Sequence, residues 1–178
     1  MIILLMGVAG CGKTLIGNKL AVKLGVRFID GDDYHSAENV AKMQQGLPLT
    51  DEDRQQWLIL LASKLASHYK DESSVVMACS ALKRSYRKIL ASRCPSVCFI
   101  LLKVPFDVVR DRIQKRKDHF FPEKLLQSQF DTLEIPTADE CTMEIDGTLE
   151  PDEIVKQIIT LAYDRDLLKR DIDGYFSI

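Results

Sequence analysis

The residues best suited to chemistry stand near the N-terminus, where an apolar run leads into a glycine-rich loop. Glycines let successive backbone N–H groups turn inward around a polyphosphate, and the N-terminus of a following helix favours the same anion. In loops of the pattern G-x-x-x-x-G-K-[ST], the lysine reaches the β- and γ-phosphates and the final hydroxyl coordinates Mg²⁺. The alternative is a glycine-rich turn with a chance lysine. The residues predicted to bind ATP here are Gly7, Val8, Ala9, Gly10, Cys11, Gly12, Lys13 and Thr14, with Lys13 catalytic.

A second group of reactive side chains follows residues 26–29, where Asp30, Asp32 and Asp33 are closely spaced. Carboxylates at this spacing repel one another unless a cation or a polyhydroxyl substrate compensates their charge. The third apolar run, residues 75–79, lacks the terminal acid through which Walker-type ATPases hold their metal. We therefore expect Asp30 or Asp32 to serve Mg²⁺. The alternative is an Asx-rich surface turn.

Apolar runs alternate along the chain with segments of helical periodicity, a pattern typical of an α/β fold with a parallel sheet. Ligands of such sheets gather at the carboxyl ends of the strands, so the glycine-rich loop, residues 30–35 and residues 79–84 are expected to face one crevice. The spacing of Thr50 and Asp53 indicates a capping box. Strands are predicted at residues 2–6, 26–29, 75–79, 97–102 and 142–145, and helices at 14–24, 50–69, 105–115 and 151–163.

Composition limits the class of protein. The chain has 178 residues, 46% of them hydrophobic, which predicts a single globular domain over residues 1–178. A net charge of −2 argues against a nucleic-acid surface, and the N-terminal apolar run is too short for a signal peptide or a membrane span. Small anions are the expected partners.

The cysteines are odd in number and include no C-x-x-C pair, which indicates reduced thiols of a cytoplasmic protein. The spacing of Cys94 and Cys98 leaves a metal site open as an alternative. The five residues are Cys11, Cys79, Cys94, Cys98 and Cys141.

Several further blocks keep their order and spacing between residue 2 and about residue 163. They are Gly31-Asp32-Asp33-Tyr34-His35, Asn39, Lys42-Met43, Gly46-x-Pro48-Leu49-x-Asp51-x-Asp53-Arg54-x-x-Trp57-Leu58, Cys79-Ser80-Ala81-Leu82-Lys83-Arg84-x-Tyr86-Arg87, His119-Phe120-Phe121-Pro122 and Ser128-Gln129-Phe130-x-x-Leu133-Glu134. Together they resemble the gluconokinase family. Cys11 departs from the family pattern because a small hydroxyl residue usually stands there.

The resemblance implies a P-loop kinase, similar in fold to shikimate kinase and adenylate kinase, that phosphorylates the 6-hydroxyl of D-gluconate with ATP. It implies a three-layer α/β/α sandwich whose five-stranded parallel sheet has the order 2-3-1-4-5, with a mobile lid at about residues 116–123. It also favours a homodimer. The open alternatives are a kinase of another small hydroxy acid, such as a shikimate-type enzyme, and a non-catalytic nucleotide-binding module.

Site roles are assigned to residues that match these blocks. Asp32 matches the carboxylate that contacts the acceptor hydroxyl in shikimate-kinase-like enzymes, and Thr14 and Asp30 are expected to hold Mg²⁺. Arg54 offers a bidentate fork for the substrate carboxylate. The other residues expected to bind substrate are Asp33, His35, Lys83, Arg87 and Gln129.

Two arginines lie at the expected lid. Arg116 is the candidate that would neutralise the γ-phosphate as the lid closes, and Arg112 is expected to bind ATP near the adenine. A solvated helix end remains the alternative for either residue. Residues 164–178 extend beyond the resemblance and are expected to dock either on the domain or on a partner.

Overall fold

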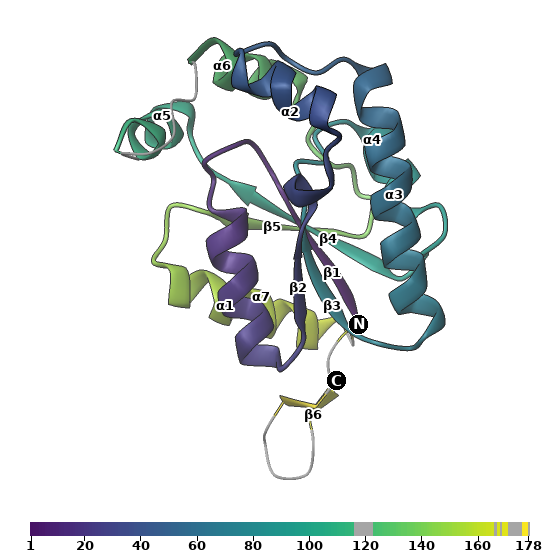
Figure 1. The fold of residues 1–178 in the computed structure, drawn as a ribbon. Helices are drawn as coiled ribbons and strands as arrows, with labels where there is room; N and C mark the ends of the chain where they lie inside the picture. The colour runs from purple at the N-terminus through teal and green to yellow at the C-terminus, as the bar shows by residue number, and fades with distance from the viewer. Residues whose placement is uncertain (116–122, 166, 168, 171–175, 178) are drawn as a thin grey trace.

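A parallel sheet lies at the centre of the computed structural model, which describes residues 1–115, 123–165, 167, 169–170 and 176–177 (Figure 1). Its strands are β1 (Ile2–Met6), β2 (Arg27–Asp30), β3 (Val75–Ala78), β4 (Val97–Lys103) and β5 (Thr142–Asp146). They are ordered β2-β3-β1-β4-β5, and every pairing is parallel. The predicted fold class and strand order are confirmed.

Helices cover both faces of this sheet. Helices α1 and α7 lie against one face and α3 and α4 against the other, while α2, α5 and α6 lie beyond the carboxyl ends of the strands (Figure 1). The helices are α1 (Lys13–Leu24), α2 (Ala37–Gln44), α3 (Asp51–Lys70), α4 (Arg84–Ala91), α5 (Phe106–Gln114), α6 (Glu123–Thr132) and α7 (Pro151–Asp164), with a 3₁₀ turn η1 (Gly31–Tyr34) after β2.

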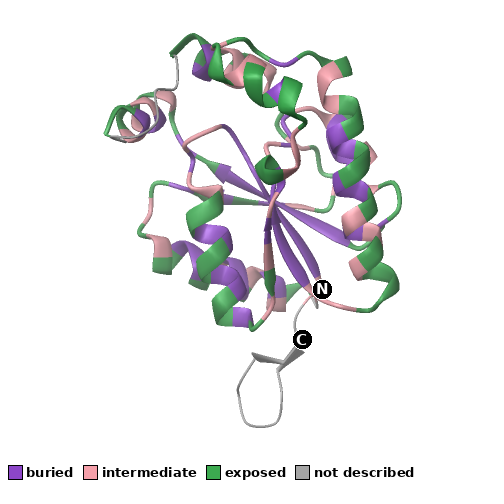
Figure 2. Cartoon of the chain, viewed as in Figure 1, coloured by how far each residue is buried: buried purple, intermediate pink, exposed green. Residues whose placement is uncertain are grey.

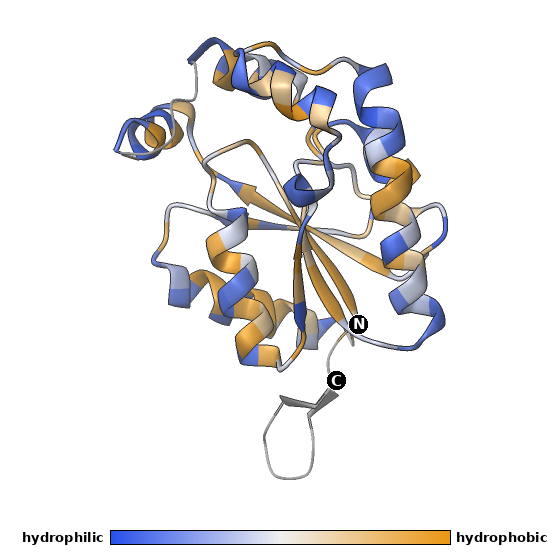
Figure 3. Cartoon of the chain, viewed as in Figure 1, coloured by the Kyte–Doolittle hydropathy of each residue, from blue (hydrophilic) through white to orange (hydrophobic). Residues whose placement is uncertain are grey.

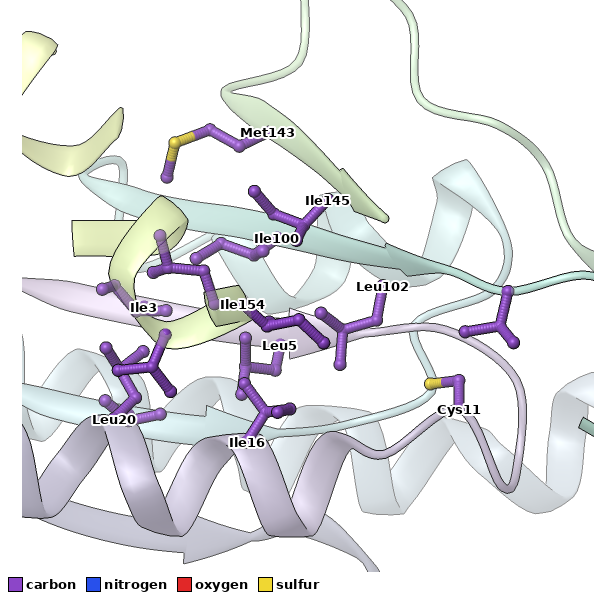
Figure 4. Close-up of a cluster of buried hydrophobic side chains, with 14 of the residues drawn as sticks. Ile3, Leu5, Cys11, Ile16, Leu20, Ile100, Leu102, Met143, Ile145 and Ile154 are labelled. Atoms are coloured by element: carbon purple, nitrogen blue, oxygen red, sulfur yellow. The ribbon is translucent and has the colours of Figure 1, made fainter. Parts of the chain in front are cut away.

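Strands β1 and β3, in the middle of the sheet, are apolar throughout because both of their faces are buried. In β1, Ile3 and Leu5 join the core beneath α1 and α7, whereas Ile2, Leu4 and Met6 join the core beneath α3. Most of the sheet is buried in Figure 2 and hydrophobic in Figure 3, whereas the edge strands β2 and β5 also carry exposed residues. Figure 4 shows the first of these cores.

The start of α3 is held by the predicted capping box. The Thr50 hydroxyl accepts the Asp53 N–H at 3.2 Å, and the Asp53 carboxylate accepts the Thr50 N–H at 2.9 Å. Helix α2 is anchored to this turn because the amide of the buried Asn39 donates to the Asp53 carbonyl at 2.8 Å. The loop between α2 and α3 is therefore fixed at both ends.

The chain beyond α7 is described only in part. The Leu167 N–H donates to the Ala162 carbonyl at 2.9 Å, and the Leu167 side chain packs against the core beneath α7, so this residue docks on the domain. Strands β6 (Lys169–Arg170) and β7 (Phe176–Ser177) then form an antiparallel pair.

Among the described residues, no helix has the length and apolar character needed to cross a bilayer. The cysteines there are free thiols, and all but Cys141 are buried. Cys94 belongs to the core beneath α3, whereas Cys98 belongs to the core beneath α1 and α7. The two thiols therefore face opposite sides of the sheet and do not form a shared metal site.

Candidate active site

The glycine-rich loop joins β1 to α1 and depends on backbone conformations that favour glycine. Gly10 and Gly12 have φ angles of 80° and 108°, in the left-handed region. A Cβ atom at Gly10 would also stand 2.8 Å from Ile113, which belongs to α5. These glycines let the loop curve tightly over the carboxyl end of β1.

The side chains of Lys13 and Gln129 form hydrogen bonds with this loop. The Lys13 ammonium donates to the carbonyls of Gly7 and Val8, both at 3.0 Å, so it lies over the loop and not in solvent. The Gln129 side-chain carbonyl accepts the Ala9 N–H at 2.6 Å, which connects α6 to the loop. Both contacts place polar groups where a polyphosphate would lie.

Cys11 is accommodated beneath the loop. Its side chain is 1% exposed and belongs to the core beneath α1, as Figure 4 shows. The thiol therefore replaces the usual hydroxyl without entering the space above the loop, where only backbone groups are needed for phosphate binding.

A hydroxyl and a carboxylate meet beside Lys13. The Thr14 hydroxyl donates to Asp30 at 2.8 Å, and the other Asp30 carboxylate oxygen accepts the Asp32 N–H at 3.1 Å. Hard oxygen ligands suit Mg²⁺, which uses one or two protein carboxylates and completes its shell with water and substrate phosphates. In the part of the chain that the structure describes, no cluster of three or more His, Cys, Asp or Glu side chains could hold a metal. The site therefore fits a cation bound together with a nucleotide.

Asp32 and His35 lie on the η1 turn that follows β2. The Asp32 side chain is 72% exposed, and one carboxylate oxygen lies 3.9 Å from His35 Nε2. His35 stacks on Trp57 with ring centroids 4.1 Å apart, and the Trp57 indole donates to the Gly31 carbonyl at 2.7 Å. Trp57 therefore positions the turn by packing. Asp33 is exposed on the same turn.

The environment of His35 favours the neutral imidazole. Burial lowers the pKa of His35 below 6.5, with the charge of Asp32 opposing this shift and that of Arg54 adding to it. His35 is therefore suited to exchanging hydrogen bonds with a hydroxyl at neutral pH.

A pocket of ≈ 140 Å³ opens between α2, α3 and α6. The Arg54 guanidinium lies at its wall, where Nη1 donates to the carbonyls of Leu49 and Thr50. The lining residues are Met43, Leu47, Pro48, Leu49, Asp51, Arg54, Leu82, Lys83, Tyr86, Leu125, Ser128, Gln129 and Thr132.

The structure places three of the expected substrate residues at this pocket: Arg54, Lys83 and Gln129. It also adds Asp51 and Tyr86, to which the sequence analysis assigned no role. Lys83 donates to both Asp51 carboxylate oxygens, at 2.7 and 2.8 Å, and the Tyr86 hydroxyl donates to Asp51. Asp51 and Arg54 are charged residues within one helical turn, and this spacing was the signal in the sequence that could have placed Asp51 at the same pocket as Arg54.

Arg87 differs from its expected place. Its side chain is 1% exposed and pairs with Glu140, to which Nη2 donates at 3.0 Å. Nη1 donates to three carbonyls, those of Ala81, Leu82 and Glu134. Its donors are thus used inside the protein, where they fix the loop after β3, and Arg87 does not present them to the pocket.

Arg112 approaches the loop from α5. Its guanidinium donates to the Gly147 carbonyl at 2.9 Å and to the Cys11 carbonyl at 3.4 Å. Arg112 therefore lies beside the nucleotide loop. Its contact with the adenine of ATP stays a prediction. Arg116 and most of the expected lid lie outside the described residues.

Comparisons with known proteins agree with this geometry. A family model described as shikimate kinase matches residues 9–162. The thermosensitive gluconokinase of Escherichia coli (strain K12) is 50% identical over 137 residues, covering 77% of this chain and 73% of that protein. An unliganded sugar kinase from Janibacter sp. HTCC2649 superposes with a TM-score of 0.85 at 42% identity, covering 89% of this chain and 92% of that one.

A second solved structure, a gluconokinase from Sinorhizobium meliloti 1021, superposes with a TM-score of 0.83 at 39% identity. It covers 93% of this chain and 95% of its own. Since these similarities extend over most of the chain, the chain belongs to the gluconokinase family of P-loop kinases.

Proposed function

We propose that this protein transfers the γ-phosphoryl group of ATP to the 6-hydroxyl of D-gluconate, giving 6-phosphogluconate and ADP. The observation that carries the proposal is a polar pocket containing Arg54 and Lys83, next to the phosphate loop, in a chain of the gluconokinase family. Gln129 contacts the loop and also lines the pocket, so the two sites adjoin.

ATP binds in this proposal through the backbone N–H groups of the loop, with Lys13 at the β- and γ-phosphates and Arg112 near the adenine. Thr14 and Asp30 hold Mg²⁺, which when bound neutralises charge on the transferred phosphoryl group. Arg116 stabilises the same charge from the lid. Because phosphoryl transfer needs positioning and charge neutralisation more than covalent help, these groups supply most of the catalysis.

Asp32 acts on the acceptor. The 6-hydroxyl oxygen forms the new bond to the γ-phosphorus while the bond to the bridging oxygen breaks, and ADP leaves with that electron pair. The hydroxyl proton passes to Asp32 late in the transfer. The Asp32 carboxylate is free to approach a hydroxyl, since its side chain is 72% exposed and His35 Nε2 lies 3.9 Å away.

Gluconate presents one carboxylate and several hydroxyls. We assign the carboxylate to Arg54, with Lys83 behind it, because a guanidinium fork matches carboxylate geometry. His35, Asp33 and Gln129 bind hydroxyls. Arg87 supports the pocket from within the protein and is not assigned a direct contact.

The homodimer is proposed from the family resemblance, and the cytoplasmic location is proposed from the free thiols. Sedimentation of the purified protein tests the homodimer.

A coupled ADP-release assay across gluconate, shikimate, hexoses and nucleoside monophosphates tests the function. Gluconate is expected to be turned over fastest, and Lys13→Ala is expected to abolish turnover while the circular dichroism spectrum is preserved. A preference for shikimate or a hexose would contradict the substrate, and full activity in Lys13→Ala would contradict the assigned loop.

A further inference from the structure

Asp51 places a carboxylate inside a pocket that is otherwise suited to an anion. It is the first residue of α3, and its side chain is 54% exposed at the pocket wall. Lys83 donates to both of its oxygens, and the Tyr86 hydroxyl donates to one of them. These bonds hold the carboxylate at the pocket wall.

The neighbouring cations surround the same ring. The Arg54 guanidinium carbon lies 5.8 Å from the centroid of the Tyr86 ring, and the Lys83 nitrogen lies 5.6 Å from it. Hydrogen bonds from Lys83 and Tyr86 lower the pKa of Asp51, and the bond to Asp51 raises the pKa of Lys83. Asp51 and Lys83 are therefore both ionised at neutral pH.

The described residues that line the pocket carry two cations, Arg54 and Lys83, and one anion, Asp51. Their sum is a single positive charge. Lys83 is already paired internally, so a bound monoanion completes the charge balance with Arg54. A dianion would bring a second negative charge close to Asp51, and like charges at short distance repel each other.

We propose that Asp51 is a specificity-determining residue that restricts the acceptor site to monoanionic sugar acids. The proposal rests on the proposed function and extends it, because it names the charge class of the acceptor and the residue that selects it. Sugar acids with a dianionic head group, such as a phosphonate in place of the carboxylate, are disfavoured by the Asp51 carboxylate and not by pocket size.

The test compares kcat/KM for gluconate with kcat/KM for its C1 phosphonate analogue, which keeps the 6-hydroxyl. The wild-type protein is expected to prefer gluconate. In Asp51→Asn the ratio is expected to move toward the phosphonate by about tenfold or more, as removal of a like charge a few ångströms away requires. The matched control is Glu52→Gln, which removes the same charge from the next residue of α3 and lies outside the pocket lining. It is expected to leave the ratio unchanged.

A double variant separates charge from shape. Asp51→Asn combined with Lys83→Gln returns the lining charge to that of the wild type, and the preference for gluconate is expected to return, even if both rates fall. Asp51→Ser provides a second neutral replacement should the asparagine variant fold poorly. An unchanged ratio in folded variants, or equal losses for both acceptors, would overturn the proposal. Failure of the wild type to phosphorylate gluconate would instead overturn the proposed function.

Discussion

Asp30 and Asp32 stand two residues apart but face different partners. Asp30 accepts from the Thr14 hydroxyl and caps the η1 turn, whereas the exposed Asp32 has His35 beside it. This division supports separate roles, with Asp30 serving the metal and Asp32 the acceptor hydroxyl.

Substitution of each aspartate provides the first prediction. Asp32→Asn should lower kcat with gluconate by about 10²–10⁴-fold, the usual contribution of general-base help, while leaving Mg·ATP affinity nearly intact. Asp30→Asn should first raise the Mg²⁺ concentration needed for half-maximal rate. Measurement of kcat and a Mg²⁺ titration for both variants decides the matter, and the reverse pattern would exchange the two roles.

The second prediction concerns pH and His35. Because burial lowers its pKa below 6.5 in the folded protein, the unfolded chain binds the proton more readily, and stability falls as the pH drops below about 6.5. In His35→Gln, part of this fall should disappear between about pH 7.5 and pH 5. Urea unfolding across this range measures the slope of the free energy of unfolding against pH. The pKa of His68 is also lowered mainly by burial, so His68 contributes its own part of the loss of stability at low pH. His68→Gln is therefore the control, because it removes that part and leaves the contribution of His35. Equal slopes in wild type and His35→Gln would contradict the prediction.

At the scale of elements, the loop after β3 depends on one buried ion pair. Arg87, on α4, joins the Ala81 and Leu82 carbonyls to Glu140, which lies just before β5. Ala81 has a φ of 44°, unusual for a residue with a side chain, so the loop needs support from its surroundings. Lys83 follows directly, and its place at the pocket depends on this loop.

The third prediction is that Arg87→Met destabilises the protein by about 3–5 kcal/mol, because it leaves the Glu140 carboxylate, whose side chain is 12% exposed, without its cation. Adding Glu140→Gln should recover part of the loss. Arg84→Met is the control, since the pair of Arg84 and Asp139 is exposed to solvent and contributes little to stability. Urea unfolding measures all three, and equal costs for Arg87→Met and Arg84→Met would refute the buried pair's role.

At the scale of the whole molecule, the two cores are joined through the sheet. Neighbouring residues such as Ile3 and Leu4 belong to opposite cores, and Leu133 packs against both. Loss of one core would expose one face of the strands whose opposite face forms the second core. The cores are therefore expected to unfold together.

The fourth prediction is that the protein unfolds in a single transition and that Mg·ATP shifts this whole transition to higher temperature. At about 100 times its dissociation constant, the nucleotide should add about 2.7 kcal/mol to the free energy of unfolding, because it binds only the folded state. Lys13→Ala should lose most of this gain. Calorimetry with and without nucleotide tests the prediction, and two separate transitions would show that the chain has more than one domain.

Local patterns in the sequence were sufficient for much of this protein. The phosphate loop is contiguous, the buried strands are apolar runs, and the capping box of α3 spans a few residues, so each could be read without knowledge of the fold. Helices α2, α4 and α6 were not predicted because they have only 8, 8 and 10 residues, too few turns to show a clear period. The order of the strands came from family resemblance and not from periodicity.

Only the tertiary structure decided which polar side chains meet. Asp51 and Lys83 are 32 residues apart, and Ala9 and Gln129 are 120 apart, yet each pair is hydrogen-bonded. Arg87 is buried because the loop after β3 and the segment before β5 converge on it. The residue type shows that a side chain is a cation. Its role depends on the carboxylates and carbonyls that folding brings within about 3 Å of it. That is why the sequence identified the nucleotide loop and the acidic turn directly, whereas the internal partners of Arg87 and Lys83 became known only from the fold.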